Sequence, residues 1–451
     1  MSDGKGMGVT QKIIWAMTIG SIFGWLLFRL GTFAEGTAFA QFMNQFVING
    51  VLFIGGKVFI NALKLLVVPL VFISLVCGVC SSSSGSQLGR VGLKTFCLYL
   101  GTTAVAVTIA LTLANVTQPG EGAELGSAES YTVGSPPTLV EVLTGMVPSN
   151  AIQAMAKANM LQVIVFALLF GLAIKHSGAA GERVRDIFSD LNHVVMSMVN
   201  LVMSFAPYGV FCLVATVFAQ KGIGFIVPLL LYVVTVVIAL AIHGGGTYSL
   251  ILVWLAKVNP LRFYKKMYPA MIFAFSTASS AATMPITLRL VQRAVGVKNS
   301  IAAFTVPMGA TINMDGTAIM QGVATVFIAG AYGIDLTLAD YLAVIATATL
   351  ASVGTAAVPG AGMITLSMVL IQVGLPAEAI GLILGVDRIL DMMRTAVNVT
   401  GDAAITTAVA GSEGQFDKSI LLSDAHGDEE EDELVEVEEA LEAMEEKPQA
   451  T

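Results

Sequence analysis

Long apolar stretches dominate the sequence and predict a chain that crosses a membrane many times. A spanning helix needs about 20 mostly apolar residues, and several of the stretches are longer than that, so tilted or broken helices are expected. The predicted spans, eight in all, are Ile13–Phe28, Val51–Val76, Phe96–Leu113, Leu161–Ile174, Val194–Ala219, Phe225–Ala256, Ile301–Ala329 and Ile380–Ala410.

Two further segments, 258–292 and 337–371, contain polar breaks that a lipid-facing helix does not tolerate. The breaks are Phe275–Pro285 (FSTASSAATMP) and Ala351–Gly362 (ASVGTAAVPGAG). Non-helical backbone at membrane depth is stable only where it is buried in protein or lines a cavity. We therefore predict two opposed re-entrant helical hairpins, each followed by a long helix, as in an inverted repeat. The alternative is two ordinary spans with Gly and Pro kinks.

Composition supports the membrane assignment. Of the 451 residues 55% are hydrophobic and 12% are charged, against about 25% charged in soluble domains. A soluble protein of this length would need more polar surface to cover its core. Four cysteines are too few for a disulfide framework. The fold class predicted is an all-α polytopic membrane protein.

The net charge of −8 is unevenly distributed. Residues 413–451 hold fifteen acids and two lysines, a charge of −13, so the rest of the chain carries +5. We expect this tail to be a disordered cytoplasmic segment. Basic residues gather in the loops on one side of the predicted spans, which places both termini in the cytoplasm, with the body in the plasma (cytoplasmic or inner) membrane. No A-x-A cleavage site follows the first span, so it is interpreted as an uncleaved helix.

Charged residues inside the last span are candidates for function, because a carboxylate at the centre of a bilayer costs roughly 2.5–3.5 kcal/mol. Asp391, Arg394, Thr395, Asn398 and Asp402 are spaced along one helical stripe. A plain ion pair between Asp391 and Arg394 is the simpler interpretation, but it leaves the other polar residues unexplained.

The chemistry of these residues suits a zwitterionic solute and a hard cation. A buried guanidinium binds a carboxylate, and an aspartate binds an ammonium group, so an amino acid with an acidic side chain would satisfy both. Asp315 and Asp402, with Asn and Thr oxygens nearby, suit Na⁺ better than a transition metal. The four histidines are too scattered for a zinc site.

Three motifs carry a resemblance to a known family. NMDGT at 313–317, ASVGTAAVPGAG at 351–362 and DMMRTAVNVTGD at 391–402 resemble signatures of the glutamate/aspartate transporters, the dicarboxylate/amino acid:cation symporters. The resemblance implies the glutamate-transporter fold, a homotrimer, and elevator-like movement of a transport unit against a static scaffold, with the second hairpin as extracellular gate. The implied parts are 1–95 (scaffold spans 1 and 2), 96–116 (transport span 3), 117–222 (extracellular loop, scaffold spans 4 and 5), 223–412 (transport domain) and 413–451 (tail).

The resemblance also implies roles for single residues. Arg394 would bind the side-chain carboxylate of the substrate and Asp391 its amino group. The pocket would be completed by Thr395, Asn398, Ser280, Thr317, Val358 and Gly362. Three Na⁺ per cycle are implied. Their ligands would be Asp402 with Gly309, Asn313 and Asn398 for the first, Thr311 with Ser352, Val353 and Thr355 for the second, and Tyr99, Thr102, Thr103, Asn313 and Asp315 for the third.

The chain departs from the family at a few positions. It has Ala278 and Met392 where relatives carry an arginine near the gate, and Ala281 where a third serine is usual. Gln321 stands where proton-coupled animal relatives have glutamate, so we predict Na⁺ coupling without an obligatory proton.

The function expected is therefore Na⁺-coupled symport of aspartate or glutamate, with either substrate open. A C4-dicarboxylate carrier would not need Asp391, and a neutral amino-acid carrier would not need Arg394. An intramembrane protease is disfavoured because no GxGD motif is present and no His pairs with Ser280; the chain is not expected to be an enzyme or to bind nucleic acid. A passive channel is an alternative function that the sequence does not exclude; uptake against a concentration gradient would exclude it.

Overall fold

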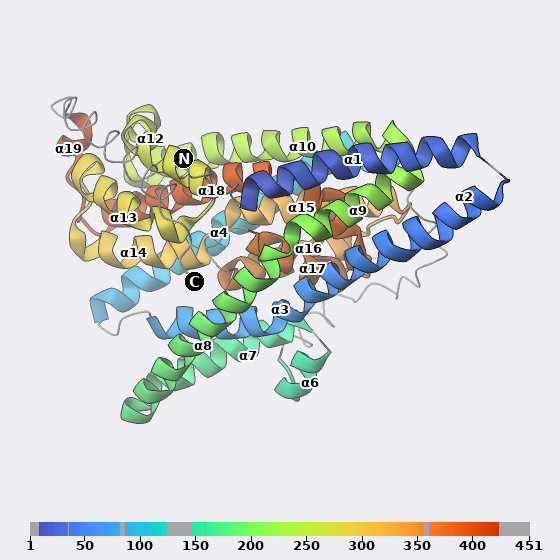
Figure 1. Ribbon diagram of the computed structural model, residues 1–451. Coiled ribbons are helices and arrows are strands. Elements are labelled where there is room, and N and C mark those ends of the chain that lie inside the picture. Colours follow the sequence, from blue (N-terminus) through green and yellow to red (C-terminus); the bar gives the residue numbers. More distant parts are fainter. Residues whose placement is uncertain are drawn as a thin grey trace, which may run out of the picture.

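The computed structural model describes residues 9–34, 36–81, 86–123, 147–157, 159–355 and 360–423. Within these ranges the protein is helical and has no strand; a single bridge pairs Val297 with Phe416. Figure 1 shows long helices that run mostly along one direction, with the short helix α19 (Lys418–Leu422) at one end of the molecule. The all-α prediction is confirmed.

One group of helices comes mainly from the first half of the chain. In it α1 packs along α9, and α3 packs against α7, α8 and α9. Large apolar side chains such as Trp15 and Phe46 are more than half exposed, as expected for surfaces that face lipid or a partner subunit. The helices are α1 (Val9–Phe33), α2 (Ala38–Phe42), η1 (Met43–Leu52), α3 (Phe53–Ser81), α6 (Ala151–Ala156), α7 (Met160–His176), α8 (Gly178–Ser204) and α9 (Ala206–Lys221).

The predicted single span Val194–Ala219 is wrong in one respect. The structure has two helices there, α8 and α9, which meet at Phe205 with a bend of 48°. Pro207 lies in the first turn of α9. Proline has no backbone N–H to donate to the preceding turn, and its ring clashes with that turn. A new helix therefore begins there and the first one does not continue.

The second group surrounds α15 and α18, which are buried along almost their whole length. It contains α4 (Ser86–Thr117), η3 (Gly222–Phe225), α10 (Ile226–Ala241), η4 (Ile242–Thr247), α11 (Tyr248–Ile251), η5 (Leu252–Ala256), α12 (Pro260–Thr277), α13 (Ser280–Leu290), η6 (Val291–Val295), α14 (Asn299–Ile312), α15 (Asp315–Ala331), α16 (Leu338–Gly354), α17 (Ala361–Gln372), η7 (Ala377–Ala379), α18 (Ile380–Ser412) and α19.

Helix pairs lie at both predicted hairpins, and in each pair the two helices pack on one another. Between α12 and α13, Ala278 adopts a left-handed conformation with φ of 50°, and Ser279 caps α13 by accepting from the Ala282 N–H. Between α16 and α17, Gly360 has φ of 80°. The polar breaks therefore end and restart helices where the sequence predicts, while the re-entrant placement of the pairs in a membrane stays a prediction.

Five helical stretches in the described ranges are long and apolar enough to span a bilayer, and a sixth if α8 and α9 count as one bent span. The remaining two predicted spans correspond to α7, with 17 residues, and to α18, whose 33 residues include several charges. The eight predicted spans thus all fall on helices.

A charged contact joins the two groups of helices. Glu378 in η7, just before α18, accepts from Lys57 at 2.8 Å and from Lys64 at 2.9 Å, both on α3. Burial alone would raise the pKa of Glu378, but the two ammonium groups outweigh it and lower the pKa to about 2. The carboxylate is therefore ionised at neutral pH.

Candidate functional site

Arg394, on the buried face of α18, is the centre of the candidate substrate site. Its side chain is fully buried, and Nη2 lies 2.8 Å from Asp391 Oδ1 and 2.9 Å from Asp387 Oδ1. Nε and Nη1 have no hydrogen-bond partner among the described residues. A buried donor without a partner is costly, so the guanidinium retains donor capacity that a carboxylate ligand would satisfy.

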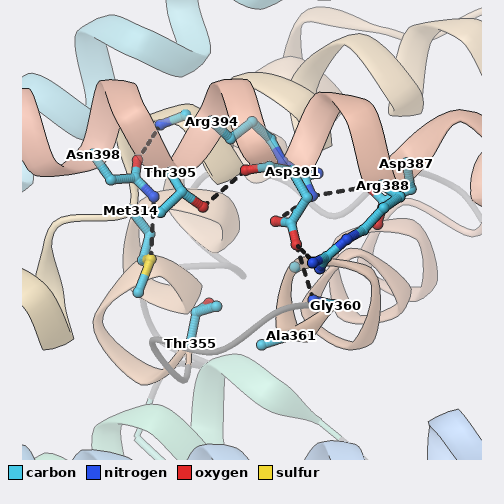
Figure 2. Close-up of polar contacts among 12 residues, drawn as sticks. Met314, Thr355, Gly360, Ala361, Asp387, Arg388, Asp391, Arg394, Thr395 and Asn398 are labelled. Carbon is cyan, nitrogen blue, oxygen red and sulfur yellow. Dashed lines mark hydrogen bonds and ion pairs between the residues drawn. The ribbon is translucent and has the colours of Figure 1, made fainter. Parts of the chain in front are cut away.

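Asp391 faces both Arg394 and the start of α17. Its Oδ2 accepts from the Gly360 N–H at 3.1 Å, and Arg388 Nη1 lies 3.9 Å from the same oxygen. Thr395 Oγ1 donates to the Asp391 carbonyl at 2.8 Å. Figure 2 shows these groups together, with Gly360 opposite the α18 stripe. The second helix pair therefore closes directly over the charged cluster.

The break between α14 and α15 is joined to α18 by two asparagines. Asn313 Nδ2 donates to Asp402 Oδ1 at 2.9 Å and to the Asn398 carbonyl at 3.1 Å. Asn398 Oδ1 in turn accepts from the Gly316 N–H at 2.7 Å. Asn313 Oδ1 is buried and has no partner in the described residues, which leaves an oxygen near Asp402 available to a cation.

Asp315, the first residue of α15, holds the densest set of hydrogen bonds in the candidate cation region. Its Oδ1 accepts from Thr103 at 2.5 Å, and its Oδ2 accepts from Tyr248 at 2.8 Å and lies 2.9 Å from His243 Nε2. All four side chains are buried. The carboxylate is therefore compensated from α4, η4 and α11 without any cation.

His243 and Tyr248 are contacts that the sequence analysis missed. Their spacing of five residues matches no α-helical stripe, but η4 is a π-helix, and there both side chains reach the same carboxylate. The signal available in the sequence was the run His243–Gly246, in which three glycines follow a lone histidine. Asp387 also lies in the last predicted span but is not part of the predicted pocket, and the structure adds it to the Arg394 cluster.

Three predicted ligands lie on α4, and one of them, Tyr99, bonds to α14. Tyr99 donates its hydroxyl to the Thr305 carbonyl at 3.1 Å, while Thr102 and Thr103 donate to the Tyr99 carbonyl at 3.0 and 2.8 Å. A Cβ on Gly309 would lie 2.5 Å from both Asp402 Oδ1 and the Tyr99 hydroxyl. Only glycine therefore allows the close approach of these oxygens to the α14 backbone.

The other predicted site residues are placed less uniformly. Ser280 and Thr317 are buried, and a Cβ on Gly362 would lie 2.9 Å from the Thr317 methyl and 3.7 Å from Arg394 Nη1. Thus Thr317 and Gly362 lie beside the guanidinium. Val358 falls outside the described residues.

The residues of the predicted second cation site also differ in burial. Ser352, Val353 and Thr355 are buried at the end of α16, and Ser352 Oγ lies 3.3 Å from the Ile312 carbonyl. Thr311 is exposed and donates to carbonyls of its own helix. Its hydroxyl would have to turn away from α14 to bind an ion.

The available donors are oxygens of carboxylates, amides, hydroxyls and backbone carbonyls, which is the chemistry preferred by hard cations such as Na⁺. Among the described residues no group of three His, Cys, Asp or Glu side chains could hold a metal ion. The orphaned amide oxygen of Asn313 and the cradle at Gly309 fit a small monovalent cation beside Asp402.

Comparison with known proteins gives a match to the sodium:dicarboxylate symporter family over residues 9–412. The chain is 33% identical to a proton/sodium-glutamate symport protein of Bacillus subtilis (strain 168), covering 80% of this chain and 86% of the relative. It is 34% identical to a proton/glutamate-aspartate symporter of Escherichia coli (strain K12), with 82% and 86% covered. It is 32% identical to human excitatory amino acid transporter 2, with 77% and 71% covered.

Proposed function

Because the chain belongs to the sodium:dicarboxylate symporter family, we propose that it is a secondary active transporter that carries aspartate or glutamate into the cell together with Na⁺. The named relatives are glutamate or glutamate-aspartate symporters and an excitatory amino acid transporter. The observation that carries the substrate assignment is the fully buried Arg394, whose Nε and Nη1 have no hydrogen-bond partner in the part of the chain that the structure describes, while Nη2 contacts two aspartates.

In the proposed complex the substrate's side-chain carboxylate binds the Arg394 guanidinium and its ammonium group binds Asp391. Without substrate, Asp391 contacts the Arg394 guanidinium and the Gly360 N–H. The carboxylate and the ammonium group of the substrate would replace these existing contacts of Arg394 and Asp391. Thr395, Asn398, Ser280, Thr317, Gly362 and Val358 complete the proposed pocket. A dicarboxylate without an ammonium group would leave Asp391 facing a like charge.

Na⁺ is the proposed coupling ion. Asp402, with Asn313, Asn398 and the Gly309 carbonyl, forms the proposed first site, and the cradle at Gly309 supports it. Thr311 with Ser352, Val353 and Thr355 forms the second, and Asp315 with Tyr99, Thr102, Thr103 and Asn313 the third. Some relatives are named as proton symporters; Gln321, which cannot titrate, favours Na⁺ without an obligatory proton.

The proposed stoichiometry has a large energetic effect. Each net positive charge that moves inward across 100 mV contributes about 2.3 kcal/mol. Three Na⁺ with one monoanionic amino acid would move two net charges, or about 4.6 kcal/mol from voltage alone. The proposal includes a homotrimer in the inner membrane with cytoplasmic termini. It also includes elevator movement of the second helix group, which surrounds α15 and α18, against the first group.

Arg394→Cys tests the substrate assignment. Aspartate uptake into proteoliposomes should fall by at least about thirtyfold, because loss of a buried charge-assisted contact costs about 2–5 kcal/mol. Na⁺-dependent uptake of a neutral amino acid such as serine should remain or appear, which shows that the variant is folded.

The matched control is Arg388→Cys, which removes a second, mostly buried arginine of the same helix, with Nη1 3.9 Å from Asp391 Oδ2. It should keep most aspartate uptake. Undiminished aspartate uptake in Arg394→Cys would overturn the proposed binding mode.

A further inference from the structure

The described chain ends against a surface on which basic side chains predominate. Residues 191–314 contain no Asp or Glu. Exposed basic side chains at the base of the first helix pair form what we call the basic face: Lys257, Arg262, Lys265, Arg293 and Lys298. They lie on or beside α12 and η6, which contact one another. Like charges on one surface repel, so such a face favours an anionic partner.

The segment after α18 is attached to this face by its backbone. Val297 bridges Phe416, and the Lys298 N–H donates to the Gln415 carbonyl at 3.0 Å. Arg262 Nη1 donates to the Leu422 carbonyl at 2.8 Å. Helix α19 packs on both α12 and η6, and Figure 1 shows it beside α12 at the end of the molecule.

The part of the sequence that follows is strongly acidic. Residues 424–451, which we call the acidic tail, hold thirteen Asp or Glu and one Lys, a charge of −12. They begin two residues after Leu422, directly beside Arg262. Twenty-eight residues can reach at most about 90–100 Å, so the whole basic face lies within reach at a high effective concentration.

The two acidic residues between α18 and the acidic tail, Glu413 and Asp417, do not neutralise the basic face. Glu413 forms ion pairs with Arg90 and Lys94 of α4. Asp417 accepts from Ser419 as the cap of α19 and also interacts with the charge of Lys298. One acid against five bases leaves a net positive surface.

We propose that the acidic tail 424–451 binds the basic face of its own chain. Bound in this way, the tail neutralises a surface that would otherwise attract anionic lipid headgroups. The exposed charges of α8 are a contrasting surface, because there both signs alternate: Glu182 and Asp186 stand beside Arg183 and Arg185, and Arg185 pairs with Asp186 at 3.0 Å. That surface offers an acidic segment no net attraction.

Zero-length carbodiimide cross-linking of the full-length protein in neutral-lipid vesicles, followed by peptide mass spectrometry, tests the proposal. Tail carboxylates should couple to Lys265 and Lys257 in preference to Lys12. The yield should fall at least fivefold in 1 M NaCl, where the screening length shrinks to about 3 Å. A yield that is equal at all lysines or insensitive to salt would overturn the proposal.

A charge-removal variant sharpens the test without removing the coupled lysines. R293Q/K298Q should lower the yield at Lys265 at least threefold, whereas the matched double variant R183Q/R185Q on α8 should leave it within error. Equal yields in the two variants would contradict the proposal, and the salt series on the unmodified chain decides the matter if R293Q/K298Q fails to fold.

Two further experiments identify what binds the basic face. Mixing heavy- and light-isotope protein should give cross-links within one isotope only, and mixed pairs would assign the face to the tail of a second copy. Repeating the experiment in vesicles with anionic lipid should preserve the yield; its loss there would assign the face to lipid headgroups instead.

Discussion

Two polar stretches, 313–317 and 391–402, share an Asn and an Asp in otherwise apolar surroundings, yet they fold differently. The first ends α14 and restarts α15, with Asn313 in an extended conformation. The second continues as one helix through α18. The break exposes backbone groups that the continuous helix then satisfies, since the Gly316 N–H bonds to Asn398.

The continuous helix and the broken helix suit different binding tasks. A continuous helix places side chains at fixed angular positions, so α18 presents Asp391, Arg394 and Asp402 along one stripe. A broken helix frees carbonyl oxygens, which suits weakly held cations. An acidic residue at the N-terminus of α15 also interacts favourably with the helix dipole. The two stretches together form a site that neither could form alone.

The largest effect is expected for the carboxylate that joins the two stretches. Asp402→Asn removes a charge from the proposed first Na⁺ site while keeping the shape of the side chain. The Na⁺ concentration for half-maximal uptake should rise at least about tenfold, equivalent to about 1.4 kcal/mol. Uptake measured over a Na⁺ series checks this.

The control for that experiment is Asp186→Asn, the same change at an exposed position of α8. Its Na⁺ dependence should be that of the unmodified protein. If Asp402→Asn also leaves the Na⁺ series unchanged, the proposed ion site is wrong.

Gly309→Ala probes the close approach of α4, α14 and α18 with a single methyl group. The new Cβ would lie 2.5 Å from Asp402 Oδ1 and from the Tyr99 hydroxyl, so either the helices separate or the oxygens move. Uptake should fall severalfold with a raised Na⁺ requirement. Gly101→Ala on α4, where nothing lies within 4 Å of the new methyl, should leave uptake unchanged.

The smallest effect is expected for Tyr248→Phe, which removes one of the donors to Asp315. The hydroxyl competes with a cation for Oδ2, and one hydrogen bond contributes on the order of 1 kcal/mol. The half-saturating Na⁺ concentration should therefore decrease by about fivefold. Tyr264→Phe, whose hydroxyl donates to the Gly244 carbonyl, should not shift it; an increase in Tyr248→Phe would refute the competition.

Sequence alone could predict the features that depend on local pattern. Apolar length located the spans, and the polar breaks located both helix pairs, because these signals are carried by consecutive residues. The bend at Phe205 was missed because Pro207 stands inside a continuous apolar run. The contacts of His243 and Tyr248 with Asp315 depend on a π-helix, which hydropathy does not reveal.

The site was predicted in outline for a different reason. Asp391, Arg394, Asn398 and Asp402 stand out as rare polar residues in an apolar helix, and they also form a recognisable motif. Contacts between distant segments had no such signal. The pairing of Gly360 with Asp391 and of Lys57 with Glu378 appears only once the helices are packed.

The Glu378 contact has a mechanical consequence. Lys57 and Lys64 are seven residues apart on α3, about 10.5 Å along the helix axis, and Glu378 bonds to both. If the two helix groups slide past one another as proposed, Glu378 would keep one lysine within reach while it leaves the other. The charged contact between the groups would then pass from one lysine to the other and would not be lost in a single step.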